Sequence, residues 1–239
     1  MRKLFLIGLL VPMLGISQTK NVVNVFRIFA KPEMNTRLEK AIAAHAQKYH
    51  KGKWAWRVME IQSGPDAGGF QINEGPLTWD DFDKRGNLGV EHTADWDRTV
   101  APLLTDKGST KYVTYQADLS TVQLTDYSDK VVINHMFAKP GMVNGVKELV
   151  VKLKKVWEAG NETVAVYNSA NSGSAETITS TRLKQGLKEL DDTFRKPIAE
   201  RFDAVHGAGS WDAYLGDYAK YVESRFSEIL AFRADLSSK

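Results

Sequence analysis

The 239-residue sequence predicts an α+β fold made of two copies of one strand-and-helix unit. The stretch IFAKPEM at 28–34 recurs as MFAKPGM at 136–142, an offset of 108 residues. Runs of β-branched and aromatic residues precede both stretches, at 22–27 and 130–135, as is typical of strands. Apolar residues at helical spacing follow both stretches at the same offset, which predicts a helix in each copy.

The remaining elements also occur in pairs, with one member in each copy. They are second strands at 53–61 and 163–170, third strands at 69–73 and 177–181, helical regions opening at 78–82 and 185–190, and last strands at 112–121 and 229–238. Thr78 and Asp81 fit a helix-capping pattern at the start of their region. The offset has grown to 117 residues at the last strand, so we expect insertions in the later helices of the second copy.

The order of strand, helix, two strands, helices and strand is that of a ferredoxin-like motif. We place the copies at 21–121 and 130–239, with a linker at 122–129. The first strand is apolar on both faces, because Val23 and Val25 alternate with other apolar residues. Such a strand is buried on both faces, which predicts tandem ferredoxin-like repeats packed sheet to sheet.

With this layout and its Lys139-Pro140-Gly141 turn, the chain resembles the dimeric α/β-barrel superfamily. That superfamily includes antibiotic-biosynthesis-monooxygenase-like, stress-responsive A/B-barrel and NIPSNAP-like domains. The resemblance implies a barrel of two facing units, here fused in one chain, so we expect an intrachain pseudo-dimer that is a monomer. Its members include cofactor-free oxygenases, haem enzymes, isomerases and proteins without known chemistry, so the fold selects no activity.

The first 17 residues have the layout of a secretory signal peptide. A basic start at Arg2 and Lys3 precedes an apolar run over 4–16, and Gly15 and Ser17 supply small residues before a cut. A buried strand or a membrane anchor is the alternative. We therefore expect an exported protein, periplasmic or extracellular, without a stable membrane anchor.

Composition excludes several function classes. The sequence has no cysteine, which excludes disulfides and thiolate chemistry. The net charge is +3, and no basic block is present, so we do not expect nucleic acid as a partner. Nucleophile-elbow, phosphate-loop and dinucleotide-binding motifs are also absent.

The repeated FAKP stretch predicts a strand-to-helix corner. Proline at the first helical position has a suitable φ and lacks an N–H that would be unpaired there. We expect Met34 and Met142 to point into the core. Lys31 and Lys139 would be structural, with an anion site as the alternative.

Arg27 and His135 occupy equivalent positions in the two first strands, and each shares a strand face with apolar residues. A charged side chain on a buried face is costly unless it is paired. Pairing with a neighbouring carboxylate such as Glu60 would explain both residues. A ligand cleft between sheet and helices would also explain them.

His45 and Trp56 are the other two candidate ligand-binding residues. His45 lies on the apolar stripe of the first helix, where the second copy has Leu153, and this asymmetry suggests that only one half binds something. The alternative is a histidine at the core edge that bonds to a carbonyl. Trp56 belongs to the aromatic stretch WAW, which suits a pocket for an apolar or aromatic molecule.

Two His-then-Trp-Asp pairs form a second tier of candidates. They are His92 with Trp96-Asp97 and His206 with Trp211-Asp212. Helix starts would explain the aspartates through the helix dipole, and core packing would explain the tryptophans. No HxxxH or HxH spacing is present, so we predict no metal and no cofactor. His50 stands beside a lysine and is predicted to lie on the surface.

These observations favour an exported small-molecule-binding protein that holds an apolar or aromatic ligand between helix and sheet. The alternative is a cofactor-independent monooxygenase-like enzyme that acts on an aromatic or quinol substrate. In it, Arg27, His45 or His135 would stabilise an anion or move a proton. A purely structural module is the third hypothesis. A pocket beside the first helix would separate the first two hypotheses from the third.

Overall fold

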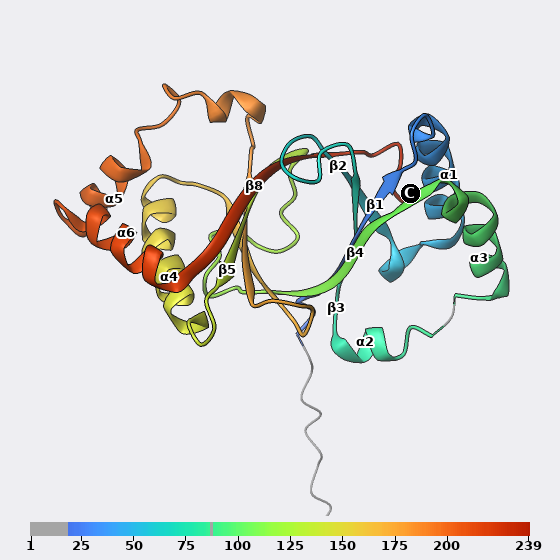
Figure 1. Ribbon diagram of the computed structural model, residues 1–239, viewed down its shortest axis with the longest axis horizontal. Coiled ribbons are helices and arrows are strands. Elements are labelled where there is room, and N and C mark those ends of the chain that lie inside the picture. The colour runs from blue at the N-terminus through green and yellow to red at the C-terminus, as the bar shows by residue number, and fades with distance from the viewer. Residues whose placement is uncertain (1–18, 87) are drawn as a thin grey trace, which may run out of the picture.

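The computed structural model describes residues 19–86 and 88–239, so the predicted signal peptide lies outside the described residues. The fold is α+β, with a closed barrel of eight strands between two layers of helices (Figure 1). The first half contains β1 (Val22–Ala30), α1 (Asn35–Tyr49), β2 (Trp56–Ile61), β3 (Phe70–Leu77), α2 (Trp79–Asp83), α3 (Val90–Asp95) and β4 (Leu104–Tyr115). The second half contains β5 (Lys130–Ala138), α4 (Val143–Ala159), β6 (Val164–Ser169), β7 (Glu176–Arg182), α5 (Ile198–His206), α6 (Ser210–Tyr221) and β8 (Val222–Phe232).

The strands close in the order β1-β3-β2-β8-β5-β7-β6-β4, and every pairing is antiparallel. Each half therefore has one strand order, in which its first strand lies between its last and its third. Two short pairings join the halves, β2 with β8 and β4 with β6. Because both edges of each sheet are paired, the barrel leaves no strand edge open.

The last strands of the two halves differ from the prediction. β4 begins at Leu104 and β8 at Val222, so both start before the predicted 112–121 and 229–238 and end earlier. β4 pairs with β1 along its length, from Val22 opposite Thr114 to Ala30 opposite Leu104. Its polar stretch is strand because of this long-range pairing, which composition does not reveal.

Both faces of β1 are buried, as the sequence predicts. Val23 and Val25 belong to the apolar cluster inside the barrel, whereas Ile28 belongs to the cluster beneath α1. Side chains alternate across a strand, so one face lines the barrel and the other supports the helices. This alternation decides where each candidate functional residue lies.

The proline corner differs in detail from the prediction. α1 begins at Asn35 and α4 at Val143, so Pro32 and Pro140 precede the helices and do not occupy the first helical position. Each proline is the second residue of a turn that precedes the helix. In the first copy the turn is closed by a hydrogen bond of 3.0 Å from the Met34 N–H to the Lys31 carbonyl.

The two lysines of the corner have the structural role. Lys31 Nζ donates to the Pro102 carbonyl at 2.9 Å, and Lys139 Nζ donates to the Ala219 carbonyl at 2.7 Å. Each lysine thus ties its corner to the segment that leads into the last strand of the same half. Met142 is 36% exposed, so the expectation that it points into the core is wrong.

The third residue of the corner has a positive φ in both copies, +64° at Glu33 and +78° at Gly141. Turns of this kind favour glycine, because a side chain strains the left-handed conformation. We expect Glu33→Gly to raise the free energy of unfolding by about 0.5–1 kcal/mol, because relief of the left-handed strain exceeds the entropic cost of a glycine. Urea unfolding measures this, and the reciprocal variant Gly141→Glu should lose a similar amount. Equal stability of Glu33→Gly and wild type would contradict the prediction.

The capping prediction is confirmed at α2. The Thr78 hydroxyl accepts from the Asp81 N–H at 2.9 Å, and the Asp81 carboxylate accepts from the Thr78 N–H at 3.2 Å. This reciprocal pair satisfies two backbone donors that the start of a helix leaves free.

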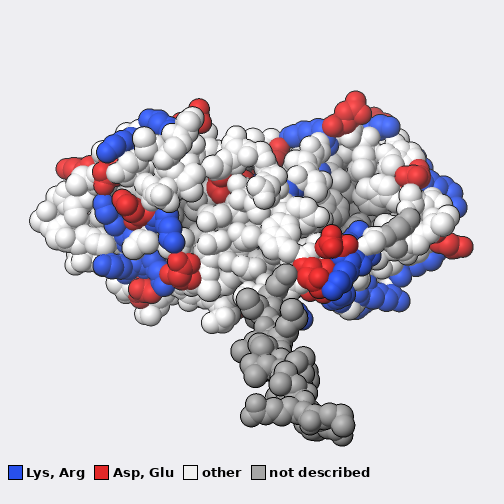
Figure 2. Space-filling model, turned by 90° about the horizontal axis from the view of Figure 1, so that it is seen from below, with Lys and Arg blue, Asp and Glu red and all other residues white. Residues whose placement is uncertain are grey.

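The surface carries mixed charge. On the face shown in Figure 2, basic and acidic side chains are interspersed over the two helical layers, and few lie over the middle of the face. That face therefore offers no extended surface of one sign. Within the described residues, no helix is both long and apolar enough to cross a membrane.

Candidate functional sites

The candidate residues from the sequence lie in three separate places. Arg27 and His135 face the inside of the barrel, so their predicted position in a cleft between sheet and helices is wrong. The first helical layer holds a second group: His45, Trp56, His92 and Trp96. His206 and Trp211 lie in the helical layer of the other half.

Inside the barrel, Arg27 is buried against two carboxylates. Its Nη1 atom donates to Asp66 at 2.7 Å and to Glu228 at 3.0 Å, and its Nη2 atom makes a second, very short bond to Glu228. The bond to Glu228 is therefore bidentate, the geometry in which a guanidinium holds a carboxylate most strongly.

His135 lies on the other side of Glu228 and extends the network. Its Nε2 atom lies 2.8 Å from Glu228, and its Nδ1 atom bonds to Glu176. Lys111 then pairs with Glu176 at 2.8 Å. Each ring nitrogen of His135 therefore faces a buried carboxylate.

The carboxylates of the network are paired with basic side chains. Burial alone would raise the pKa of Glu228, but the hydrogen bonds from His135 and Arg27 outweigh it and lower the pKa below its ordinary value. The predicted pairing with a carboxylate is confirmed for both residues, but the suggested partner Glu60 is wrong, because Glu60 lies 3.4 Å from Arg233. Glu228, the true partner, is 201 positions away from Arg27 along the chain.

A cavity of about 130 Å³ lies within the barrel. Its walls are mainly apolar and come from both halves: Val23, Val25, Met59, Val113, Val131 and Ile133. His135 and Gln71 bring the buried network to the cavity. On β5, Val131 lies next to the linker and His135 lies four residues further on, so the network and the linker are at opposite ends of the cavity.

The linker segment 122–129 covers its end of the cavity through Leu124, Tyr127 and Ser128. Arg57 lies beneath it, with its guanidinium 3.6 Å from the centre of the Phe232 ring. Arg57 Nη2 donates to the Ser128 carbonyl at 3.1 Å. The linker is thus held onto the barrel by an arginine that also lines the cavity.

Two arginines at the linker end of the cavity have no close carboxylate among the described residues. Within the described residues, no carboxylate lies at ion-pair distance from Arg57, and burial lowers its pKa. Arg182, which also lines the cavity, donates to the Gln123 and Leu124 carbonyls, and within the described residues its one carboxylate at ion-pair distance is Asp126, at 3.8 Å. A half-buried Arg57 and a buried Arg182 without a close carboxylate are costly, and an anionic ligand would relieve that cost.

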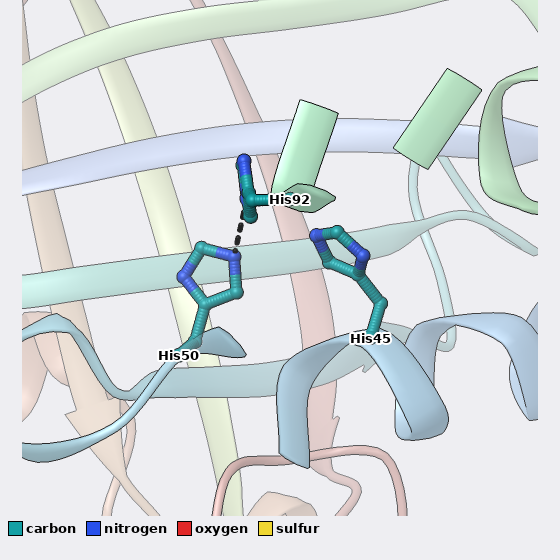
Figure 3. Close-up of side chains that lie close together, drawn as sticks. All are labelled: His45, His50 and His92. Carbon is teal, nitrogen blue, oxygen red and sulfur yellow. Dashed lines mark hydrogen bonds between the residues drawn. The ribbon is translucent and has the colours of Figure 1, made fainter. Parts of the chain in front are cut away.

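The second site is a cluster of three histidines, His45, His50 and His92, whose rings point toward one another (Figure 3). His45 lies on α1, His50 follows the last residue of that helix, and His92 comes from α3. The surface position predicted for His50 is wrong, because its side chain is 0% exposed. Its ring stacks on that of Trp56, with ring centres 3.6 Å apart.

One nitrogen of each buried histidine faces a carboxylate. His45 Nδ1 lies 2.8 Å from Asp95 Oδ2, so the predicted carbonyl partner is wrong. His50 Nδ1 lies 3.4 Å from Glu74 Oε2. Glu74 is itself fixed by Arg85 at 2.9 Å and by the Trp56 indole at 3.2 Å.

The other nitrogens converge. His50 Nε2 lies 3.2 Å from His92 Nε2, and one ligand atom of each of the three rings lies within 4.8 Å of the others. His45 Nε2 is buried and has no hydrogen-bond partner. Burial, followed by the two neighbouring imidazoles, lowers the pKa of His92 to about 4, and burial also lowers the pKa of His50.

The helix around the second-tier residues in this half differs from the prediction. Trp96 begins a five-residue π-helical turn that continues α3, which itself begins at Val90. Asp97 therefore lies far from a helix start, and the dipole explanation is wrong for it. The ring centres of Trp96 and His45 are 5.3 Å apart, so Trp96 packs against the histidine cluster.

The second half has no counterpart of the histidine cluster. His206 Nε2 bonds to the Lys152 carbonyl at 2.9 Å, and Trp211 stacks on Tyr214 with ring centres 5.1 Å apart. Asp212 lies in the first turn of α6, where the dipole explanation holds. The asymmetry predicted from His45 and Leu153 therefore extends to the residues that surround these two positions.

Sequence reasoning missed His50, Glu74 and Asp95. His45 and His50 are five positions apart at a helix end, and His92 comes from another helix, so no local ligand spacing could reveal them. The available signal was Glu74, a carboxylate in an apolar strand, which needs a buried partner.

No protein-family model matches the sequence, and no curated protein matches it significantly. Solved structures do match. An anthrone oxidase-like protein has 14% identity and a TM-score of 0.57, with 90% of this chain and 92% of that chain covered. A candidate monooxygenase from Fusobacterium nucleatum has 11% identity and a TM-score of 0.53, with 88% and 91% covered.

A candidate monooxygenase from Lactobacillus acidophilus has 10% identity and a TM-score of 0.50, with 92% of this chain and 96% of that chain covered. These matches span nearly the whole chain, so it shares the dimeric α/β-barrel fold with these proteins. At such low identity the likeness concerns the fold alone.

Proposed function

We propose that this chain is an exported binding protein that holds a small apolar or aromatic anion inside its barrel. One observation carries the proposal. An apolar cavity is bounded at one end by a network of paired charges and at the other by Arg57 and Arg182, neither of which has a carboxylate closer than 3.8 Å among the described residues. The ligand's apolar body would fill the cavity, and its anionic group would meet the arginines.

The volume limits the ligand to a small molecule. An apolar protein cavity of about 150 Å³ is known to accept benzene. The barrel cavity of about 130 Å³ is of similar size and suits one aromatic ring or a short acyl chain. A carboxylate attached to either would reach the polar end.

The contacts of the residues around the barrel cavity favour ligand binding over catalysis. The monooxygenase-like alternative needs a group that can accept a proton from the substrate. His135 is the histidine at this cavity, and both of its nitrogens are engaged by carboxylates. The solved structures of candidate monooxygenases share the fold, which selects no reaction.

The architecture and location complete the proposal. The identical strand order in both halves supports a fusion of two ferredoxin-like repeats, closed within one monomer. The signal-peptide pattern at the start of the sequence supports export.

Arg57→Gln tests the ligand class. We expect the purified protein to bind benzoate or hexanoate more tightly than benzyl alcohol or hexanol in calorimetric titrations. Arg57→Gln should weaken carboxylate binding by about tenfold or more, because a charge-assisted contact is lost, and should leave alcohol binding unchanged.

Arg37→Gln, an exposed arginine on α1, is the matched control and should bind like wild type. Two results would overturn the proposal. One is the absence of binding of all four probes at millimolar concentration. The other is an equal effect of Arg57→Gln on acids and alcohols.

A further inference from the structure

We propose that His45, His50 and His92 form a binding site for one divalent transition-metal ion, with zinc as the best-fitting candidate. The site lies between α1, α3 and the barrel wall, and it is independent of the barrel cavity. Three observations carry it: the convergence of the Nε2 atoms, the carboxylates behind two of the rings, and the unpartnered nitrogen of His45.

The spacing of the ring nitrogens fits a metal. Zinc binds histidine nitrogens at 2.0–2.1 Å in tetrahedral geometry, which places two such nitrogens about 3.3 Å apart. His50 Nε2 and His92 Nε2 are 3.2 Å apart. The third ring belongs to the same group, whose ligand atoms lie within 4.8 Å, so a modest shift of His45 completes three ligands.

The partners behind the rings are those of metal-binding histidines. Such a histidine usually gives its other ring N–H to a carboxylate, which fixes the tautomer and aims the free nitrogen at the ion. Asp95 hydrogen-bonds to His45 Nδ1 at 2.8 Å, and Glu74 lies at ion-pair distance from His50 Nδ1, 3.4 Å away. Both carboxylates also supply negative charge close to the cation.

The unpartnered nitrogen is the observation that a purely structural role leaves unexplained. A histidine whose Nδ1–H bonds to a carboxylate has an acceptor lone pair on Nε2. In His45 this atom is buried without a hydrogen-bond partner, which is a costly arrangement. A bound cation would satisfy it.

The three ligands leave one tetrahedral position for water or another small donor, the arrangement of zinc sites with an open position. His45 and His50 are fully buried, whereas His92 is half-exposed, so solvent reaches the site on the side of His92. The rings of Tyr49 and Trp96 lie close to the histidines there.

Metal titration tests the site directly. Protein without a histidine tag is stripped with a chelator, loaded with Zn²⁺, desalted and analysed for metal content, and its affinity is measured against a coloured chelator. We expect one equivalent of zinc. Co²⁺ should give the intense visible absorption of a four-coordinate ion. Saturation at about 100 times Kd should raise Tm by about 5–10 °C.

His92→Ala is the main variant, because the half-exposed side chain can be removed without opening the core. It should weaken zinc binding by about 100-fold or more and abolish the cobalt absorption. Asp95→Asn should weaken binding by about tenfold or more, through loss of the carboxylate behind His45. His206→Ala, which removes a histidine of the other half, is the matched control and should bind like wild type.

Either of two outcomes would overturn the proposal. Wild-type protein that retains well under one equivalent of both metals has no such site. Equal loss of binding in His92→Ala and His206→Ala would place the metal elsewhere on the chain. Far-ultraviolet circular dichroism of each apo variant distinguishes loss of metal binding from loss of folding. If His92→Ala unfolds, zinc binding by Asp95→Asn still tests the site.

Discussion

Replacing Glu228 with glutamine is expected to destabilise the folded protein by about 3–5 kcal/mol, the usual cost of removing one partner from a buried ion pair. Glu228 is buried between Arg27 and His135, and it accepts hydrogen bonds from both. The variant leaves Arg27 and His135 without the buried carboxylate that they share. Folded proteins are stable by only about 5–15 kcal/mol, so this loss is a large share of the total.

Urea unfolding at pH 7 measures the effect. Glu60→Gln is the matched control, because Glu60 pairs with Arg233 at 3.4 Å but its side chain is 39% exposed. An exposed pair is worth about 0–1 kcal/mol, so we expect the control to stay within about 1 kcal/mol of wild type. A similar small loss for Glu228→Gln would show that the barrel network is solvated.

A double-mutant cycle with Arg27→Met separates the pair from its surroundings. If Arg27 and Glu228 depend on each other, the double variant should lose less stability than the sum of the single variants. Additive losses would mean that His135 and Asp66 satisfy the two groups without the direct pair.

The repeat made most of the fold predictable from the sequence. Two copies at an offset of 108 residues predicted the strands and the first helix of each half, and the alternation on β1 predicted burial on both faces. The ends of β4 and β8 were not predictable. They are set by long-range strand pairing, which polar residues such as those around Gly108 conceal.

Individual site residues were predictable, but their partners were not. A charged side chain in an apolar strand identifies Arg27 and His135 as unusual from sequence alone. The carboxylate that joins them lies on β8, far along the chain, and only barrel closure brings it close. The sequence therefore indicated a need for compensation without indicating where it comes from.

The partners of the histidine cluster were even less predictable from the sequence. His45 was identified because Leu153 replaces it in the other copy, whereas His50 looked like a surface residue beside Lys51. Its burial depends on Trp56, which stacks on it from β2. A comparison between repeats can find a position that has diverged, but the ligands contributed by other elements appear only when the helices are packed.

Acid is expected to destabilise the protein in a specific pH range because of the barrel carboxylates. Glu228 and Glu176 have folded-state pKa values below their ordinary value of 4.5, since hydrogen bonds from cationic partners outweigh the opposing effect of burial. A carboxyl with a lowered pKa contributes stability that is fully present above its unfolded pKa. That stability is lost as the pH falls through the folded value.

The free energy of unfolding should therefore fall steeply below about pH 4.5. Glu228→Gln should show a shallower fall in that range, because one of the titrating groups is gone. Urea midpoints of both proteins from pH 7 to 3, in the presence of a chelator, measure the difference. Parallel curves below pH 4.5 would contradict the assignment.

His92 also titrates as the pH falls, but it does not confound this comparison. Its pKa is lowered from 6.5 to about 4, mainly by burial, so its protonation costs stability as the pH falls between those values. That loss occurs in wild type and in Glu228→Gln alike, because His92 lies outside the barrel beside α1. It therefore cancels in the difference between the two curves, and what remains below pH 4.5 reports the charge of Glu228 against Arg27 and His135.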